Sequence, residues 1–301
     1  MELLQKPTRF RAYQLGTEGS SFSYFNGSNF TLIEARITST SVTSVFEEIE
    51  KCKISSINTL HITSWDNDHC KPSELEIIMK HLKPKLIEYP GYQPDTDDGK
   101  ESKKIIENSQ KLQVNNTHSQ KIDPPYLRSL SNAGQFGYSN ILYNPRDTFE
   151  KGNDNSVIQL FRSGSFTVAS LGDVESTQIQ KMLMESHIFC TEVDVMILAH
   201  HGADNGFTTD AFIKKIKPKV GIASSDYDDK YSHPKPVVKN ILYENGIPLY
   251  TTKTGDVIIQ SYGDHSKNYN VANLVKDSTQ LSSSKNFTTK RYLASIISSL
   301  L

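Results

Sequence analysis

Residues that bind metal ions or transfer protons follow four apolar stretches of this 301-residue sequence. INTLHIT is followed by SWDNDH, FTVASLG by Asp173, VDVMILA by His200 and His201, and VGIAS, after a polar loop, by His233. Short apolar runs of this kind are typical of buried strands. In α/β sheets the loops after the carboxyl ends of strands share one crevice, where ligands bind. We therefore expect these four endings to face a common pocket.

The first ending, SWDNDH, has the composition of a metal-binding loop. Asp66 and Asp68 offer oxygen ligands and His69 offers a nitrogen ligand. Two carboxylates this close together repel each other unless a cation neutralises them. The structural alternative is a turn whose carboxylates cap a helix that begins at Pro72. The other three endings, which are also rich in His and Asp, favour the metal site.

The elements that would position these residues alternate between strands and helices. Strands are expected at 10–15, 22–25, 30–35, 57–63, 156–162, 166–171, 193–199, 220–224, 248–252 and 257–262. Helices are expected at 42–52, 72–82, 102–112, 176–186, 210–216 and 236–245. Strands that alternate with helices in this way predict an α/β fold.

One domain is expected over residues 1–262. The polar, turn-rich region at about 91–152 interrupts the pattern and is expected to be an insertion or a long loop region. Residues 263–301 are rich in Ser, Lys and Asn, and we expect them to form a loose C-terminal extension. The apolar end of this extension, YLASIISSLL, is expected to be a helix that docks on the domain or on a partner.

Composition limits the classes of function. Lys and Arg number 33 against 34 Asp and Glu, so the chain lacks the strong basic excess of a non-specific DNA-coating protein. Its three cysteines are scattered and have no CxxC spacing, which fits reduced thiols in a cytoplasmic protein. The N-terminal sequence lacks the continuous apolar run of a secretory signal, and no stretch is long enough for a membrane helix. A cytoplasmic location without a membrane partner is expected.

The motifs, in their order, resemble the nuclease-like domain of the competence protein ComEC, a metallo-β-lactamase-fold hydrolase. SWDNDH is similar to the HxDxDH of ComEC-like members, with Ser64 in place of the first His. GNDNS, SLGD, ILAHHGADNG, YSHP and TKTGDVII follow in the order of the remaining family blocks. The resemblance covers about residues 10–262, apart from 91–150, and implies an αββα sandwich of two mixed β-sheets flanked by helices.

The resemblance also implies the roles of individual residues. Asp66 would serve a first metal position, and Asp68 with His69 a second. Asp173 matches a carboxylate that bridges two metals. His200 and His201 share one block, and the sequence leaves open which of them is a ligand. His233 would be a further ligand or would contact the scissile phosphate.

Several departures from the family pattern bear on the number of metal ions. Ser64 removes one nitrogen donor, and Asn155 is a poor ligand where related enzymes place another. The site is therefore expected to hold one tight ion and a second, weak or substrate-completed ion (Mn, Zn or Mg), with oxygen-rich ligands favouring Mn or Mg over Zn. His61, within an apolar strand, is expected to be buried and hydrogen-bonded. Glu34 stands where the family has a supporting Asp.

The expected function is metal-dependent hydrolysis of a phosphodiester, with DNA as the leading substrate implied by the resemblance. Asp68 and Asp173 would hold the attacking water, and His233 would stabilise the departing oxygen. The expected substrate-binding residues share polar or basic side chains near the motifs: Ser64, Asn155, Ser156, Tyr231, Lys230 and Lys235. Lysines at 214, 215, 217 and 219 either extend a rim that binds the DNA backbone or form solvated surface.

Two other functions stay open. The first is hydrolysis of a small substrate such as a cyclic nucleotide or an ester, because the fold hosts many chemistries. A closed pocket made by the 91–150 region would favour it. The second is a non-catalytic scaffold whose metal site is degenerate. A regulatory protein partner or homo-oligomer, and a role in antiviral defence, are further hypotheses that the sequence does not decide.

Overall fold

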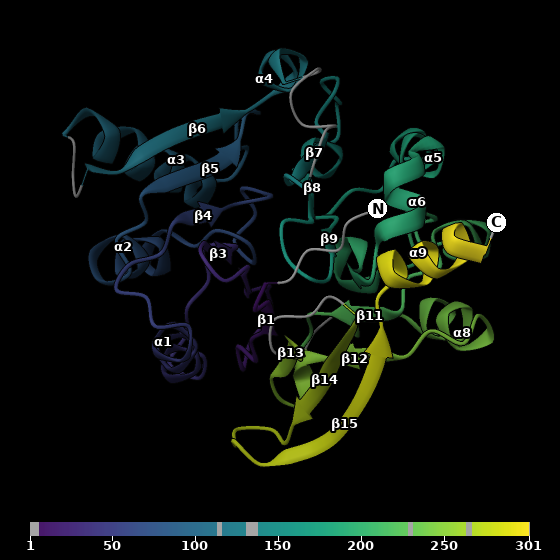
Figure 1. Ribbon diagram of the computed structural model, residues 1–301. Coiled ribbons are helices and arrows are strands. Elements are labelled where there is room, and N and C mark those ends of the chain that lie inside the picture. Colours follow the sequence, from purple (N-terminus) through teal and green to yellow (C-terminus); the bar gives the residue numbers. More distant parts are fainter. Residues whose placement is uncertain (1–5, 113–115, 131–137, 228–230, 263–266, 301) are drawn as a thin grey trace.

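A computed structural model of the protein describes residues 6–112, 116–130, 138–227, 231–262 and 267–300. The strands of these residues form two mixed sheets with helices on their outer sides (Figure 1). One sheet has the order β15-β14-β13-β1-β2-β3-β4-β5-β6, and the other has the order β12-β11-β10-β9-β8-β7. This arrangement confirms the expected αββα sandwich.

The first sheet contains antiparallel strands at one end and parallel strands at the other. Its strands are β1 (Arg9–Ala12), β2 (Phe22–Phe25), β3 (Phe30–Ile33), β4 (Thr59–His61), β5 (Leu86–Pro90), β6 (His118–Ile122), β13 (Val257–Ser261), β14 (Asn268–Leu274) and β15 (Leu281–Thr288). Strands β3 to β6 are parallel to one another. The helices between them are α1 (Val42–Lys51), α2 (Pro72–His81) and α3 (Asp97–Lys111). The SWDNDH loop follows β4 and precedes α2.

The second sheet places the other three motifs. Its strands are β7 (Ile141–Asn144), β8 (Ile158–Phe161), β9 (Val168–Ser170), β10 (Val195–Ile197), β11 (Val220–Ala223) and β12 (Leu249–Thr251). Its helices are α5 (Thr177–Glu185), α6 (His187–Glu192), α7 (Asp210–Ile216) and α8 (Pro236–Glu244). Strands β9 to β12 are parallel. The chain segments after β9, β10 and β11 therefore leave the sheet at the same edge.

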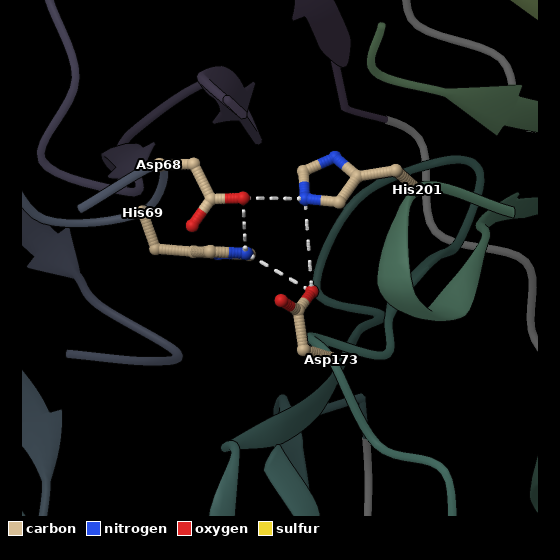
Figure 2. A group of neighbouring side chains, drawn as sticks. All are labelled: Asp68, His69, Asp173 and His201. Atoms are coloured by element: carbon tan, nitrogen blue, oxygen red, sulfur yellow. Dashed lines mark hydrogen bonds and ion pairs between the residues drawn. The ribbon is translucent and has the colours of Figure 1, made fainter. Parts of the chain in front are cut away.

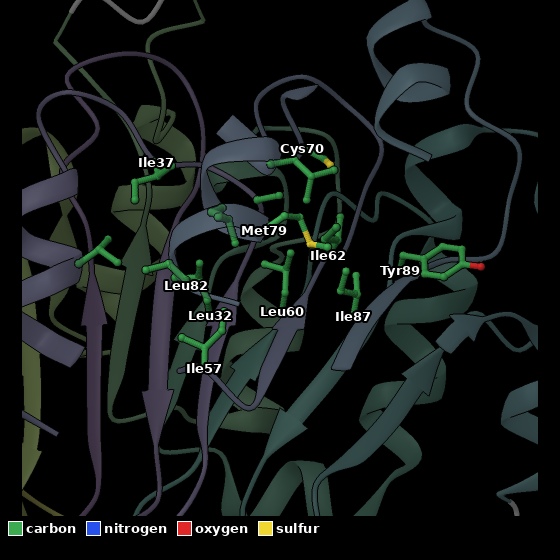
Figure 3. Close-up of a cluster of buried hydrophobic side chains, with 14 of the residues drawn as sticks. Leu32, Ile37, Ile57, Leu60, Ile62, Cys70, Met79, Leu82, Ile87 and Tyr89 are labelled. Carbon is green, nitrogen blue, oxygen red and sulfur yellow. The ribbon is translucent and has the colours of Figure 1, made fainter. Parts of the chain in front are cut away.

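Three layers of apolar side chains hold the sandwich together. Alternate residues of a strand point to opposite faces of its sheet, and β10 shows the consequence: Val195 and Ile197 lie between the sheets, while Met196 packs under the outer helices. In the first sheet, Leu32 and Leu60 face α1 and α2 in a cluster that Figure 3 shows from the side. Strands β8 to β11 are buried on both faces, which explains why they read as continuous apolar runs.

The region 91–152 belongs to both sheets. Its helix α3 begins at Asp97, five residues before the expected start, because the Thr96 hydroxyl accepts a hydrogen bond from Gly99 N and caps the helix. Strand β6 then forms an edge of the first sheet, short helix α4 (Pro124–Ser129) follows, and β7 forms an edge of the second.

The residues after 262 do not form the loose extension that the sequence predicted. Strand β14 pairs with β13 and buries Tyr269 and Val271, so the first sheet continues into this region. Helix α9 (Lys290–Leu300) docks on the domain beside α6. Arg291 is fully buried there and forms an ion pair of 2.7 Å with Glu192. The polar composition of β15 concealed the hairpin, because most of its side chains are exposed.

Candidate metal centre

Four side chains from three strand ends converge at the shared edge of the two sheets (Figure 2). Asp68 and His69 follow β4, Asp173 follows β9 and His201 follows β10. Asp68 Oδ2 lies 3.0 Å from His201 Nε2, and His69 Nε2 lies 3.0 Å from Asp173 Oδ1. One potential ligand atom from each residue lies within 4.8 Å of the other three. We call these residues the four-residue cluster.

The spacing of the four-residue cluster fits a divalent metal ion. Ligand atoms held at about 2.0–2.2 Å from one ion lie about 3.0–3.6 Å apart. The two 3.0 Å separations lie in this range, and two further ones are longer, at 4.0 Å for His69 Nε2 to Asp68 Oδ2 and 3.9 Å for His201 Nε2 to Asp173 Oδ1. His69 Nε2 is also buried without a partner in hydrogen-bond geometry. Two carboxylates and two imidazoles of this spacing are a suitable ligand set for Zn or Mn.

The outer nitrogen of each clustered histidine is held by the protein. His69 Nδ1 lies 3.2 Å from Glu34 Oε1, and Glu34 also accepts hydrogen bonds from the backbone N–H and the hydroxyl of Thr63. His201 Nδ1 lies 2.9 Å from Ser224 Oγ. Metal-binding histidines almost always have such a partner on the other nitrogen, because it fixes the ring and the tautomer. Both rings therefore present Nε2 to the centre of the cluster.

Charge within the cluster calls for a cation. Among the described residues, the ion-pair partners of Asp68 and Asp173 are the two histidines. Burial lowers the pKa of His69, but Asp173, Glu34 and Asp68 outweigh this effect and raise it well above its ordinary value. Burial likewise opposes the shift at Asp173, yet His69 and His201 hold its pKa below the usual range. In the absence of metal, protons on the imidazoles supply the positive charge that the carboxylates require.

The backbone approaches the cluster closely at two glycines. Gly172 has φ +57°, and a Cβ there would lie 2.8 Å from Ser156 Cβ, so only glycine allows Asp173 to follow this turn. Gly202 has φ +85°, and a Cβ there would lie 2.7 Å from Pro234 Cβ. His200 and His201 also have positive φ values of 48° and 56°. Strained residues of this kind cluster at functional sites.

A cavity of about 410 Å³ opens beside the cluster. Asp66 lines it and is not part of the cluster. Burial, together with Asp173 and Asp68, raises the pKa of Asp66. His200 lines the cavity as well, and its Nδ1 lies 2.9 Å from Glu175 Oε1. The structure thus brings His201 into the cluster and His200 to the cavity wall, a choice that the sequence left open.

The residues of the YSHP block lie next to the cluster. His233 is buried, and its ring stacks on that of His201 at a centroid distance of 5.9 Å and an interplanar angle of 4°. Tyr231 stacks in turn on His233, is 52% exposed and lines the cavity. The Lys235 backbone N–H donates to Gly202 O. Lys230 lies outside the described residues, so its predicted contact with substrate stays a prediction.

Three other predicted residues hold the loops around the site. Ser64 is fully buried, and its hydroxyl lies 3.1 Å from the Tyr92 hydroxyl. The Asn155 amide bonds the backbone of Phe149 and Lys151. Ser156 Oγ accepts from the backbone N–H of Asp173 at 3.2 Å. Substrate binding by these three residues stays a prediction.

The lysines proposed as a rim at 214–219 lie at the wrong end of the second sheet. They fall at the end of α7 and before β11, whereas Ser224, which contacts His201, follows the other end of β11. These lysines are close to the motifs in sequence, but the length of β11 separates them from the site in space. Sequence reasoning missed Lys71, which lines the cavity directly after the metal-binding loop. It also missed Glu175 and Tyr92, whose types and positions gave no signal of their contacts.

The sandwich architecture and the edge position of the cluster are those expected of a metallo-β-lactamase-like hydrolase fold, and comparisons with known proteins agree with the ComEC-like resemblance. The chain is 25% identical over 211 residues to ComE operon protein 3 of Bacillus subtilis (strain 168), a match that covers 69% of this chain and 25% of that protein. It is 28% identical over 100 residues to competence protein ComA of Neisseria gonorrhoeae, covering 33% of this chain and 14% of that protein. The matched regions thus span a quarter or less of these relatives.

No protein-family model matches the chain. Among solved structures, the metallo hydrolase Igni18 of Ignicoccus hospitalis is similar with a TM-score of 0.47 at 13% identity, covering 83% of this chain and 98% of that one. So distant a likeness carries no functional conclusion. Within the described residues, no helix combines the length and the apolar character needed to cross a membrane. The cytoplasmic location stays a prediction.

Proposed function

We propose that this protein is a metal-dependent phosphodiester hydrolase whose leading substrate is DNA. The observation that carries the proposal is the convergence of Asp68, His69, Asp173 and His201, with potential ligand atoms of all four within 4.8 Å of one another. The ligand types suit a divalent ion such as Mn, Zn or Mg. Such an ion, when bound, supplies Lewis acidity and an activated water at neutral pH.

The chain's own residues would divide the work around the cluster. Asp68, which is less buried than its three partners, faces the cavity and is suited to orient the attacking water. His200, whose Nδ1 is held by Glu175, leaves Nε2 for an oxygen of the phosphate. Lys71, with its side chain 44% exposed at the cavity wall, adds a positive charge for the same group. Tyr231 offers an aromatic face on which a base can stack.

DNA is proposed because of the ComEC-like resemblance and the similarity to two competence proteins. A small substrate, such as a cyclic nucleotide, is the second candidate, and the cavity favours it. Its volume of about 410 Å³ is within the usual range for small-molecule sites. Its wall mixes acidic and basic side chains and so lacks the strongly basic character of a nucleic-acid groove. These are Glu18, Asp66, Asp68 and Asp173 with Arg36, Lys71 and His200. The region 91–152 contributes no side chain to this lining.

Hydrolysis assays distinguish these functions. Plasmid, linear and single-stranded DNA and a cyclic nucleotide would be incubated with the protein and Mn²⁺, Zn²⁺ or Mg²⁺. Asp68→Asn and Asp173→Asn would remove one carboxylate charge each from the cluster. Asp97→Asn is the matched control, because the same change falls on a fully exposed side chain at the start of α3.

We expect DNA cleavage that requires metal. This cleavage should be lost in both cluster variants and should persist in Asp97→Asn. Cleavage of the cyclic nucleotide alone, with the same pattern across the variants, would replace DNA by the small substrate. Absence of cleavage in a protein that binds no metal would contradict the proposal and favour the non-catalytic scaffold.

A further inference from the structure

Ser64 and Asn155 stand where the family places further ligands for the metal position beside Asp66, but neither lines the cavity. The Ser64 hydroxyl, 3.1 Å from the Tyr92 hydroxyl, also accepts a hydrogen bond of 3.2 Å from Asp66 N. The Tyr92 hydroxyl accepts a bond of 3.0 Å from Trp65 N, so the two side chains tie the metal-binding loop to the chain after β5. We call Ser64, Tyr92 and Asn155 the sealed side of the site.

Asn155 on the sealed side has no free polar atom. Its Oδ1 accepts from Phe149 N at 2.9 Å, and its Nδ2 donates to Phe149 O at 2.8 Å and to Lys151 O at 3.0 Å. The whole side chain is 4% exposed. To face an ion, the Asn155 side chain would have to break these three part-buried hydrogen bonds to the backbone. The backbone groups would then be left without their partner, which costs free energy.

Tyr92 and the partners of Asn155 come from the 91–152 region, which the family motifs do not cover. Burial raises the pKa of the Tyr92 hydroxyl to about 12, so it is neutral and is not an anionic ligand at physiological pH. Asp66, Glu18 and His200 also line the cavity. Among the described residues, however, the four-residue cluster is the one set of three or more such side chains whose ligand atoms lie within 4.8 Å of one another. A protein-bound ion takes three or four ligands, so the remaining donors do not form a second site.

From these contacts we infer that the site holds a single divalent ion per chain, at the four-residue cluster, and that Ser64, Tyr92 and Asn155 close the other metal position, the one beside Asp66. This inference rests on the proposed function, since it presumes that the cluster binds metal. It assigns Asp66 to the cavity wall, where its carboxylate faces the substrate side and is not a metal ligand.

Metal stoichiometry tests the inference without reference to activity. The full chain would be stripped with EDTA, reloaded with excess Mn²⁺ or Zn²⁺, freed of loosely held ions by gel filtration, and measured for metal per chain by inductively coupled plasma mass spectrometry. One equivalent is expected for the wild type. Asp66→Asn should retain one equivalent, and His69→Ala should fall to none.

The outcomes separate the two proposals. Two equivalents in the wild type, falling to one in Asp66→Asn, would overturn the single-ion inference and leave the proposed function standing. No retained metal in a folded wild-type chain would overturn both. A Ser64→His/Tyr92→Phe double variant gives an independent readout: it restores a nitrogen donor and removes the sealing hydroxyl, so a gain towards two equivalents is expected. If this variant misfolds, the Asp66→Asn comparison still decides.

Discussion

The four-residue cluster and the sealed side use polar side chains in opposite ways. In the cluster, His69 and His201 are held by Glu34 and Ser224 through their outer nitrogens, and their inner nitrogens face two carboxylates. On the sealed side, hydroxyl and amide groups satisfy each other or the backbone. The family motifs thus follow one another in the expected order in this sequence, but only some of their residues are placed as a metal-ligand set.

The largest effect is expected from the cluster carboxylates. Asp173→Asn replaces an anion that faces both histidines, so metal affinity should fall by more than the ~10–100-fold that loss of an outer partner costs. Isothermal titration with Mn²⁺ or Zn²⁺ measures this loss. Asp97→Asn, at an exposed site, should bind as the wild type does. Unchanged affinity in Asp173→Asn would remove this residue from the centre.

A smaller loss is expected from the residues that hold the histidines. Glu34→Gln removes the charge that orients His69, and metal affinity should drop by about 10–100-fold. Ser224→Ala should cost less, because the Ser224 carbonyl, 3.3 Å from His201 Nδ1, stays in place. Titration of both variants ranks them. An equal or larger effect of Ser224→Ala would show that the hydroxyl, and not the carbonyl, orients the ring.

Metal affinity should rise with pH. The carboxylates raise the pKa of His69 and of His201 despite their burial, so both rings tend to hold a proton that an incoming ion must displace. At a pH below these raised pKa values, the protonated, metal-free state is favoured. As the pH rises through the pKa values, the rings lose their protons, which then no longer compete with the metal ion. Each proton released changes the affinity by about tenfold per pH unit. Titrations at several pH values check this, and a pH-independent affinity would contradict it.

The smallest effect is expected on the sealed side. Tyr92→Phe removes the hydroxyl that bonds Ser64 and Trp65 N, which should lower the free energy of unfolding by about 1–3 kcal/mol, since a buried donor loses its partner. Metal affinity should stay within about twofold of the wild type, because among the described residues the hydroxyl is bonded to Ser64 and Trp65 N, which lie outside the cluster. Chemical denaturation and metal titration measure the two quantities. A loss of metal without a loss of stability would make Tyr92 part of the centre.

Much of the fold could be predicted because its core strands are apolar and short. The patterns placed β4, β9, β10 and β11 and hence the edge where the motifs meet. Among the strands that the sequence missed, β6 and β15 are sheet edges with polar or exposed residues, where alternation gives little signal, whereas β5 and β14 lie inside the first sheet. Helix α6 was missed because six residues are too few to show helical periodicity.

The candidate site was predictable in its residue types and less so in its contacts. Asp68, His69 and Asp173 could be named because a metal needs those types after strands. The choice between His200 and His201 depended on a backbone turn with positive φ, which no side-chain pattern reveals. The contact between Ser64 and Tyr92 joins segments from different strands, and nothing in either segment indicates the other.

The central claim, that Asp68, His69, Asp173 and His201 hold a divalent ion, is tested most directly by anomalous diffraction from crystals of the protein grown with Mn²⁺. One strong anomalous peak is expected within bonding distance of all four side chains, with no comparable peak beside Ser64. A peak elsewhere in the molecule, or none at the cluster at full Mn²⁺ loading, would contradict it.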